Sequence, residues 1–265
     1  MTSLGGLVDR YTAALRMDGP HRAPDRDERA AADVLAAAIA TGTDVTAPAV
    51  ALGFSVSEVA GRTVLASDPR TERSWGLLVL PVGEPSAVVE VPHPGSDLRT
   101  EEVGVAVLER CASALYLQAG SHRRAGAPPD ARRHGDFPAD VAHRPDSVFA
   151  RVAAGLVARR GLAQVQLHGF ADRPGFDVVA SAGAAAGSTL LEETVRRLGA
   201  AGEVVRRGGE PGCDDLSGVL NTQGRDAARH GTAFVHVELS RSLRRSAVRR
   251  DRAAEAVAGA VAAAT

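Results

Sequence analysis

The chain has 265 residues, of which 45% are hydrophobic and 24% charged, an ordinary composition for a globular protein with a buried core. Its 31 basic and 32 acidic residues give a formal net charge of -1, which excludes a bulk electrostatic attraction to nucleic acid or to an anionic membrane. Aromatic residues make up only 3%, which argues against stacking platforms for single-stranded nucleic acid. The sequence has arginine but no lysine, so chemistry that needs a lysine amine is excluded.

Two cysteines, Cys111 and Cys213, are too few for a disulfide framework or a four-thiolate metal site. The N-terminus lacks the basic start and the continuous apolar run of a signal peptide. No stretch of sequence is apolar for long enough to span a bilayer. We therefore expect a cytoplasmic protein that binds neither nucleic acid nor membranes.

The N-terminal third predicts helices followed by a β region. Prolines and charged residues separate a first helix from a second one near 27–40. Residues 54–59 alternate in polarity, and 62–66 are a candidate pairing partner. We treat residues 1–70 as a helical and β extension and residues 71–265 as the main domain.

From residue 75 onward, apolar strands alternate with amphipathic helices. Strands are expected at 75–82, 87–91, 115–118, 162–167, 176–180, 204–205 and 234–239. Helices are expected at 101–114, 147–160, 189–199 and from 247 onward, with Thr189 and Glu192 forming a capping box. Residues 120–138 and 206–224 are expected to form long loops. The alternation predicts an α/β fold with a mixed, mostly parallel sheet flanked by helices.

Three strands end in ionisable residues. The first delivers His93 to its tip, and Asp97 follows after a tight turn. Imidazole and carboxylate on one turn are suitable ligands for zinc. The competing interpretation is that Asp97 or Thr100 caps the next helix, whose dipole favours Glu101 and Glu102 in its first turn.

The second strand end places His168 before Gly169, where glycine permits a close approach of backbone to ligand, although a core histidine is the competing interpretation. The third strand ends with Glu238, which needs a cation, a metal-bound water or solvent unless it pairs with Arg241 or Arg244. Together the three ends offer two histidines, one carboxylate and a further glutamate. That is the side-chain set of a catalytic zinc site with a general base.

These segments resemble the poly-γ-glutamate hydrolase family, phage-type amidohydrolases with a zinc-carboxypeptidase-like fold. That family has a His-Gly-Gly-x-Ile-Glu-x-Gly-Thr turn, and the similar turn here runs from His93 to Thr100, with Asp97 in place of the glutamate and one residue fewer. Leu167-His168-Gly169 resembles the family's Leu-His-Gly strand end, and 236–244 resembles its closing Gln-Leu-Glu-Leu-Ser…Arg. The order of the motifs is the same. The N-formylglutamate amidohydrolases, related in fold, fit about as well at the level of the reaction.

The resemblance implies a Zn²⁺ ion held by His93, Asp97 and His168, with Glu238 as the base that activates water against an amide or peptide bond. A cation is also needed to stabilise an oxyanion or to dock a substrate carboxylate. The candidates around the substrate are Arg244 and His143 for catalysis, and His122, Arg123, Arg124 and Asn221 for binding. A small-molecule or peptide substrate that carries a carboxylate, such as a γ-glutamyl amide, suits such arginines.

The shorter side chain of Asp97 leaves two alternatives open. Either Glu101 or Glu102 could complete the metal site instead. Otherwise the protein is a degenerate hydrolase fold that serves as a binding or regulatory module without metal.

Overall fold

The computed structural model describes residues 3–132 and 136–264, and within them nine strands form one sheet. The strands are β1 (Ser55–Val59), β2 (Arg62–Ala66), β3 (Gly76–Val79), β4 (Ala87–Val91), β5 (Ala114–Ala119), β6 (Ala163–Phe170), β7 (Val178–Ser181), β8 (Val205–Arg207) and β9 (Phe234–Ser240). Their order across the sheet is β1-β2-β3-β5-β4-β6-β9-β7-β8. The four central strands β5, β4, β6 and β9 run parallel, while β1, β2, β3 and β5 are joined by antiparallel pairs, as are β9 and β7.

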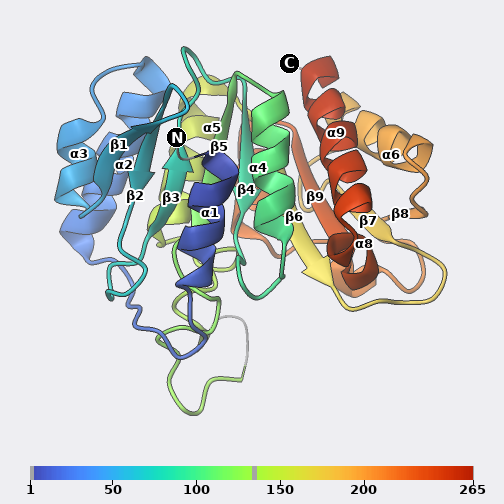
Figure 1. The fold of residues 1–265 in the computed structure, drawn as a ribbon, viewed down its shortest axis with the longest axis horizontal. Coiled ribbons are helices and arrows are strands. Elements are labelled where there is room, and N and C mark those ends of the chain that lie inside the picture. The colour runs from blue at the N-terminus through green and yellow to red at the C-terminus, as the bar shows by residue number, and fades with distance from the viewer. Residues whose placement is uncertain (1–2, 133–135, 265) are drawn as a thin grey trace.

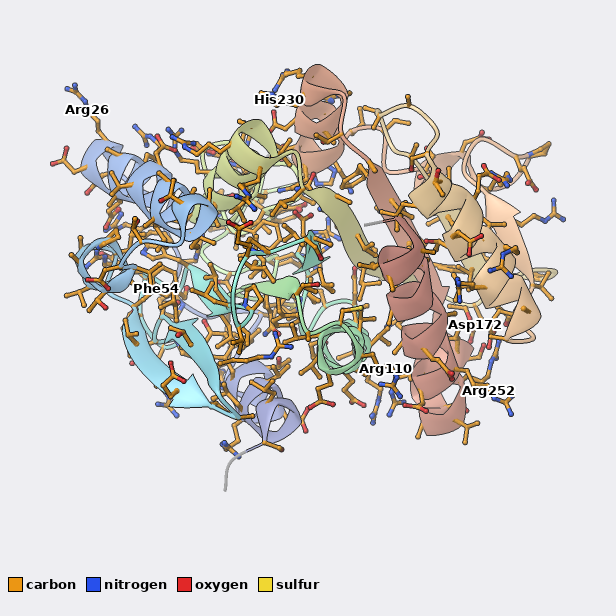
Figure 2. All side chains as sticks on the ribbon, turned by 90° about the horizontal axis from the view of Figure 1, so that it is seen from above. Arg26, Phe54, Arg110, Asp172, His230 and Arg252 are labelled. Carbon is orange, nitrogen blue, oxygen red and sulfur yellow. The ribbon has the colours of Figure 1, made fainter. Side chains whose placement is uncertain are left out.

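Helices cover both faces of this sheet. They are α1 (Leu4–Ala13), α2 (Arg26–Thr41), α3 (Thr46–Ala51), α4 (Thr100–Arg110), α5 (Val148–Arg160), α6 (Thr189–Ala200), α7 (Thr222–His230), α8 (Arg241–Arg245) and α9 (Ala247–Ala264). One core lies under α1, α4, α6, α8 and α9, and a second lies under α2, α3 and α5. Figure 2 shows α2 and α7, marked by Arg26 and His230, on the side opposite α4 and α9, marked by Arg110 and Arg252. This arrangement confirms the predicted α/β class, with a mixed sheet that is parallel at its centre.

The N-terminal region contributes to the same sheet. β1 and β2 pair as the predicted hairpin, closed by Ala60 and Gly61, which both take positive φ as a tight two-residue turn requires. β2 pairs in turn with β3. The predicted extension therefore continues directly into the strands of the main domain.

Several helix boundaries differ from the sequence analysis. The N-cap of α6 is Ser188, whose hydroxyl accepts from the Leu191 amide. Leu191 has no polar side chain to complete a capping box, so the capping box predicted for Thr189 and Glu192 is wrong. The short helices α3, α7 and α8 were not predicted. Helices of five to nine residues contain too few turns for an apolar period to stand out.

The carboxyl ends of the four central strands meet at one edge of the sheet. Figure 1 shows the long connection between β5 and α5, predicted as a loop, hanging below this edge. In an α/β sheet this is where side chains from several loops converge on one place. Of the helices in the described residues, none combines the length and the apolar character that crossing a bilayer requires.

Glu90 is a fully buried carboxyl in the central strand β4. The side-chain amides of Gln164 and Gln166 donate to its two oxygens at 2.7 and 2.8 Å. No ion pair of Glu90 is found in the described part of the chain, and burial raises the pKa of its carboxyl to about 8.

This buried carboxyl predicts that the free energy of unfolding falls as the pH rises from about 5 to about 8. The unfolded chain releases the Glu90 proton near its ordinary pKa of 4.5, while the folded protein holds it up to about 8. Between these values the folded state binds more protons, so stability is lost at up to about 1.4 kcal/mol per pH unit. Denaturant unfolding across this range, compared with Glu90→Gln, measures the slope. An equal slope in both proteins would contradict the assignment.

Candidate metal centre

His93 lies two residues beyond β4, in a turn that brings Asp97 back toward it. The Asp97 amide donates to the His93 carbonyl at 2.9 Å, and Gly95 takes the positive φ of 75° that the turn uses. His93 Nδ1 then lies 3.3 Å from Asp97 Oδ2. The residue that caps α4 is Arg99, and it makes no side-chain capping bond, so the alternative of Asp97 or Thr100 as the helix cap is wrong.

His168 lies near the carboxyl end of the neighbouring strand β6, next to His93 and Asp97. Its Nδ1 lies 3.4 Å from Asp97 Oδ2, and the Gly169 amide donates to that oxygen at 3.2 Å. The rings of His93 and His168 meet edge to face with centroids 4.7 Å apart. One ligand atom from each of His93, Asp97 and His168 lies within 4.8 Å of the others, and the three side chains are buried.

The second nitrogen of each imidazole faces an acceptor of its own. His93 Nε2 lies 2.8 Å from Asp140 Oδ1, and His168 Nε2 lies 3.0 Å from Gln166 Oε1. When the Nε2 protons are assigned to these partners, both Nδ1 atoms and the Asp97 carboxylate face one another as acceptors. Such a cluster has the acceptors that a bound cation requires. Two imidazole nitrogens and a carboxylate oxygen suit zinc, with a coordination position left for water.

The protonation states of these groups follow from burial and from their partners. Burial acts to raise the pKa of the Asp97 carboxyl, but the His168 and His93 imidazoles beside it hold it well below its usual range. Burial lowers the pKa of His168 to about 4. For His93, burial and the charge of Arg123 act to lower the pKa, yet hydrogen bonds to Asp140 and Asp97 raise it. Asp97 and His168 are therefore in the forms that bind a metal, and at His93 a metal competes with a proton.

Glu238 lies on β9 directly beside His168 in the parallel register. Its carboxyl is buried, and Oε2 has no hydrogen-bond partner among the described residues. Burial, together with the charge of Asp97, raises the pKa of Glu238 well above its ordinary value. The salt bridge to Arg241 or Arg244 considered as an alternative is not formed in the part of the chain that the structure describes.

His236 joins this group, although the sequence analysis gave it no role. Its Nε2 lies 3.7 Å from Glu238 Oε1, and its ring centroid lies 4.5 Å from that of His168. Its Nδ1 is buried without a partner in the described residues. Ligand atoms of His168, His236 and Glu238 lie within 4.8 Å of one another, so a second candidate metal group overlaps the first.

A cavity of about 330 Å³ opens on these side chains. Its walls are formed by His93, Arg123, His143, His168, Gly169, the segment 214–221, His236 and Glu238. Three of the predicted substrate residues therefore lie on the cavity wall: Arg123, His143 and Asn221. Arg123 also donates to Asp140 Oδ2 at 2.7 Å, and His143 Nδ1 lies 3.0 Å from Asp140 Oδ1, so the same carboxylate connects both to His93.

Other predicted residues lie away from the cavity. The Arg124 guanidinium stands 5.5 Å from the Phe137 ring centroid, and the Arg124 amide donates to His122 Nδ1 at 3.2 Å. Neither Arg124 nor His122 belongs to the cavity wall. Glu102 pairs with Arg99 and Arg250, and neither it nor Glu101 belongs to a metal group among the described residues.

Arg244 occupies a different position from the one expected of a catalytic cation. Its buried guanidinium donates to the carbonyl oxygens of Leu239 at 3.0 Å, Leu98 at 2.5 Å and Phe170 at 3.0 Å. A Cβ atom on Gly169 would lie 2.4 Å from this guanidinium. The glycine after His168 therefore makes room for Arg244, and the arginine holds β6, β9 and the loop after β4 together.

A comparison with protein-family models finds no match, and a comparison with curated proteins finds none. Solved structures with a similar fold include a bacteriophage poly-gamma-glutamate hydrolase, at 16% identity and a TM-score of 0.48, over 70% of this chain and 87% of that one. This is the family that the sequence motifs resemble.

Two further solved structures are similar. A metallo-carboxypeptidase from Burkholderia cenocepacia matches 83% of this chain and 69% of its own, at 12% identity and a TM-score of 0.44. The succinylglutamate desuccinylase from Chromobacterium violaceum matches 85% of this chain and 75% of its own, at 14% identity and a TM-score of 0.47. The side chains described above, and not these likenesses, carry the chemistry of the site.

Proposed function

We propose that the protein is a zinc-dependent hydrolase that cleaves an amide or peptide bond in a substrate bearing a carboxylate. His93, Asp97 and His168 would hold the ion. The observation that carries this proposal is that both Nδ1 atoms converge on the Asp97 carboxylate while each Nε2 atom already has an acceptor. Zinc, when bound, supplies Lewis acidity and lowers the pKa of a coordinated water.

Glu238 is the candidate general base. It takes a proton from the water whose oxygen bonds to the amide carbon, and it gives a proton to the leaving nitrogen as the C–N bond breaks. Support for this role comes from its place on the cavity wall beside His168 and from its unpaired Oε2 in the described residues. His236 Nε2 lies 3.7 Å from Glu238 Oε1, and we propose that it helps to orient the carboxyl.

The cavity wall carries both signs of charge, because Arg123 lies on it together with Asp214 and Asp215. Arg123 lies on the wall, and its planar guanidinium suits a carboxylate of the substrate. His143 and Asn221 lie on the same wall and offer further hydrogen bonds. We therefore propose γ-glutamyl amides and other carboxylate-bearing amides as the substrate class.

The metal content of the purified protein tests the proposal. Elemental analysis after exposure to zinc is expected to give about one zinc per chain for the wild type and almost none for His168→Ala, because the variant retains only two of the three protein ligands. His230→Ala, which removes an exposed histidine of α7, is the matched control and is expected to keep its zinc. A wild type that binds no zinc would contradict the proposal and favour a binding module without metal.

A further inference from the structure

A chain of buried amides lies behind His168, and the proposed mechanism does not use it. The Gln166 side-chain nitrogen donates to Glu90 Oε2 at 2.8 Å and to Gln223 Oε1 at 3.1 Å. The Gln223 nitrogen donates to the backbone carbonyl of Val141 at 3.1 Å. We call this group the amide chain: the Glu90 carboxyl on β4 and the side-chain amides of Gln166 on β6 and Gln223 on α7. All three side chains are almost completely buried.

The orientation of the two glutamine amides is fixed from the Val141 end of the amide chain. A backbone carbonyl only accepts, so Gln223 must turn its nitrogen to Val141 and its oxygen to Gln166. Gln166 therefore faces this oxygen and the Glu90 carboxyl with its nitrogen. Rotating the Gln166 amide by half a turn would place its oxygen against the Gln223 oxygen, which only accepts, in a buried site, at a cost of about 1–3 kcal/mol for the unmade bond.

This orientation leaves the Gln166 oxygen facing the metal site. It accepts from the Asn221 side-chain amide at 2.6 Å and lies 3.0 Å from His168 Nε2. Asn221 occupies the N-cap position of α7 but makes no capping bond with its side chain, which is turned to Gln166 instead. A neutral His168 has one ring proton. Nε2 faces the Gln166 oxygen at 3.0 Å, whereas Nδ1 lies 3.4 Å from Asp97 Oδ2, so the nearer and fixed acceptor draws the proton to Nε2.

We propose that Gln166 is a positioning residue that fixes the tautomer of His168, and that Glu90 and Gln223 act through it by fixing its amide. His168 then carries its proton on Nε2 and presents Nδ1 as a free acceptor toward Asp97. The inference rests on the proposed function, since the free Nδ1 matters because a metal binds there. It differs from the arrangement at His93, where a carboxylate, Asp140, faces Nε2. A neutral amide holds the ring without stabilising a second proton on it.

The first test is the tautomer of His168 in the metal-free wild type. Nitrogen-15 chemical shifts of the ring at neutral pH are expected to show the proton on Nε2. A proton on Nδ1 would overturn the proposal. This measurement needs neither a variant nor zinc, so it decides the role of Gln166 even if the wild type fails to bind zinc and the proposed function falls.

The second test compares zinc affinity between two matched variants by competition with a chelating indicator. Gln166→Met is expected to weaken zinc binding about 10- to 100-fold, the loss usual for a residue that orients a metal ligand. The matched control is Gln164→Met. Gln164 is a buried glutamine on the same face of β6 that bonds Glu90 but not His168. The zinc affinity of this variant is expected to stay within about threefold of the wild type. Glu90→Met is expected to weaken binding less than Gln166→Met, since it removes one partner of the Gln166 amide while Gln223 still sets its orientation. Equal zinc affinities for folded Gln166→Met and Gln164→Met would overturn the proposal.

Discussion

Replacing Glu238 with glutamine is expected to slow amide hydrolysis by about 10³-fold, within the range that general acid–base groups contribute, while the zinc content stays at about one per chain. Glutamine keeps the size of the side chain but cannot take a proton from water. The measurement is kcat on a panel of carboxylate-bearing amides that includes γ-glutamyl dipeptides, together with elemental analysis of the same samples. Glu255→Gln makes the same change at an exposed position on α9 and is expected to keep full activity.

The result also separates the two overlapping groups of candidate ligands. If Glu238→Gln loses its zinc together with its activity, Glu238 is a ligand in the group with His168 and His236, and not the base. If the variant keeps both zinc and activity, the proton is handled by another group on the cavity wall. Only the loss of activity with zinc retained supports the mechanism proposed here.

Four of the side chains at this site could be predicted because they stand at strand ends. His93, Asp97, His168 and Glu238 follow or finish apolar segments, and strands that run parallel bring their carboxyl ends to one edge of a sheet. Alternation along β9 also places His236 and Glu238 on one face of the strand. Alternation along β6 likewise places Gln166 and His168 on one face, although the sequence analysis gave Gln166 no role.

Other features depend on tertiary structure and could not be predicted. Asp140 lies in the long connection between β5 and α5, where no period of the sequence indicates which side chain turns inward. Arg244 was expected to face substrate because the sequence shows an arginine beyond a strand end but not the partners of its donors. Those partners are backbone carbonyls of segments far apart in the chain, which only the folded sheet brings together.

Arg244→Met is expected to lower the free energy of unfolding by about 3–5 kcal/mol. The substitution keeps a long side chain but leaves the carbonyls of Leu98, Phe170 and Leu239 without their charged donor, at about 1–3 kcal/mol for each buried acceptor left unsatisfied, with water able to replace part of the loss. Denaturant unfolding measures this difference. Arg241→Met changes an exposed arginine on the same short helix α8 and is expected to have an effect within about 0.5 kcal/mol.

The same variant distinguishes a structural arginine from a catalytic one. Leu98 follows Asp97, and Phe170 lies two residues beyond His168, so the guanidinium also holds the two segments that carry these metal ligands. We therefore expect Arg244→Met to weaken zinc binding along with stability. A catalytic cation that docks substrate would instead raise KM or lower kcat and leave both the unfolding curve and the zinc affinity unchanged. That outcome would support the catalytic role that the sequence analysis predicts for Arg244.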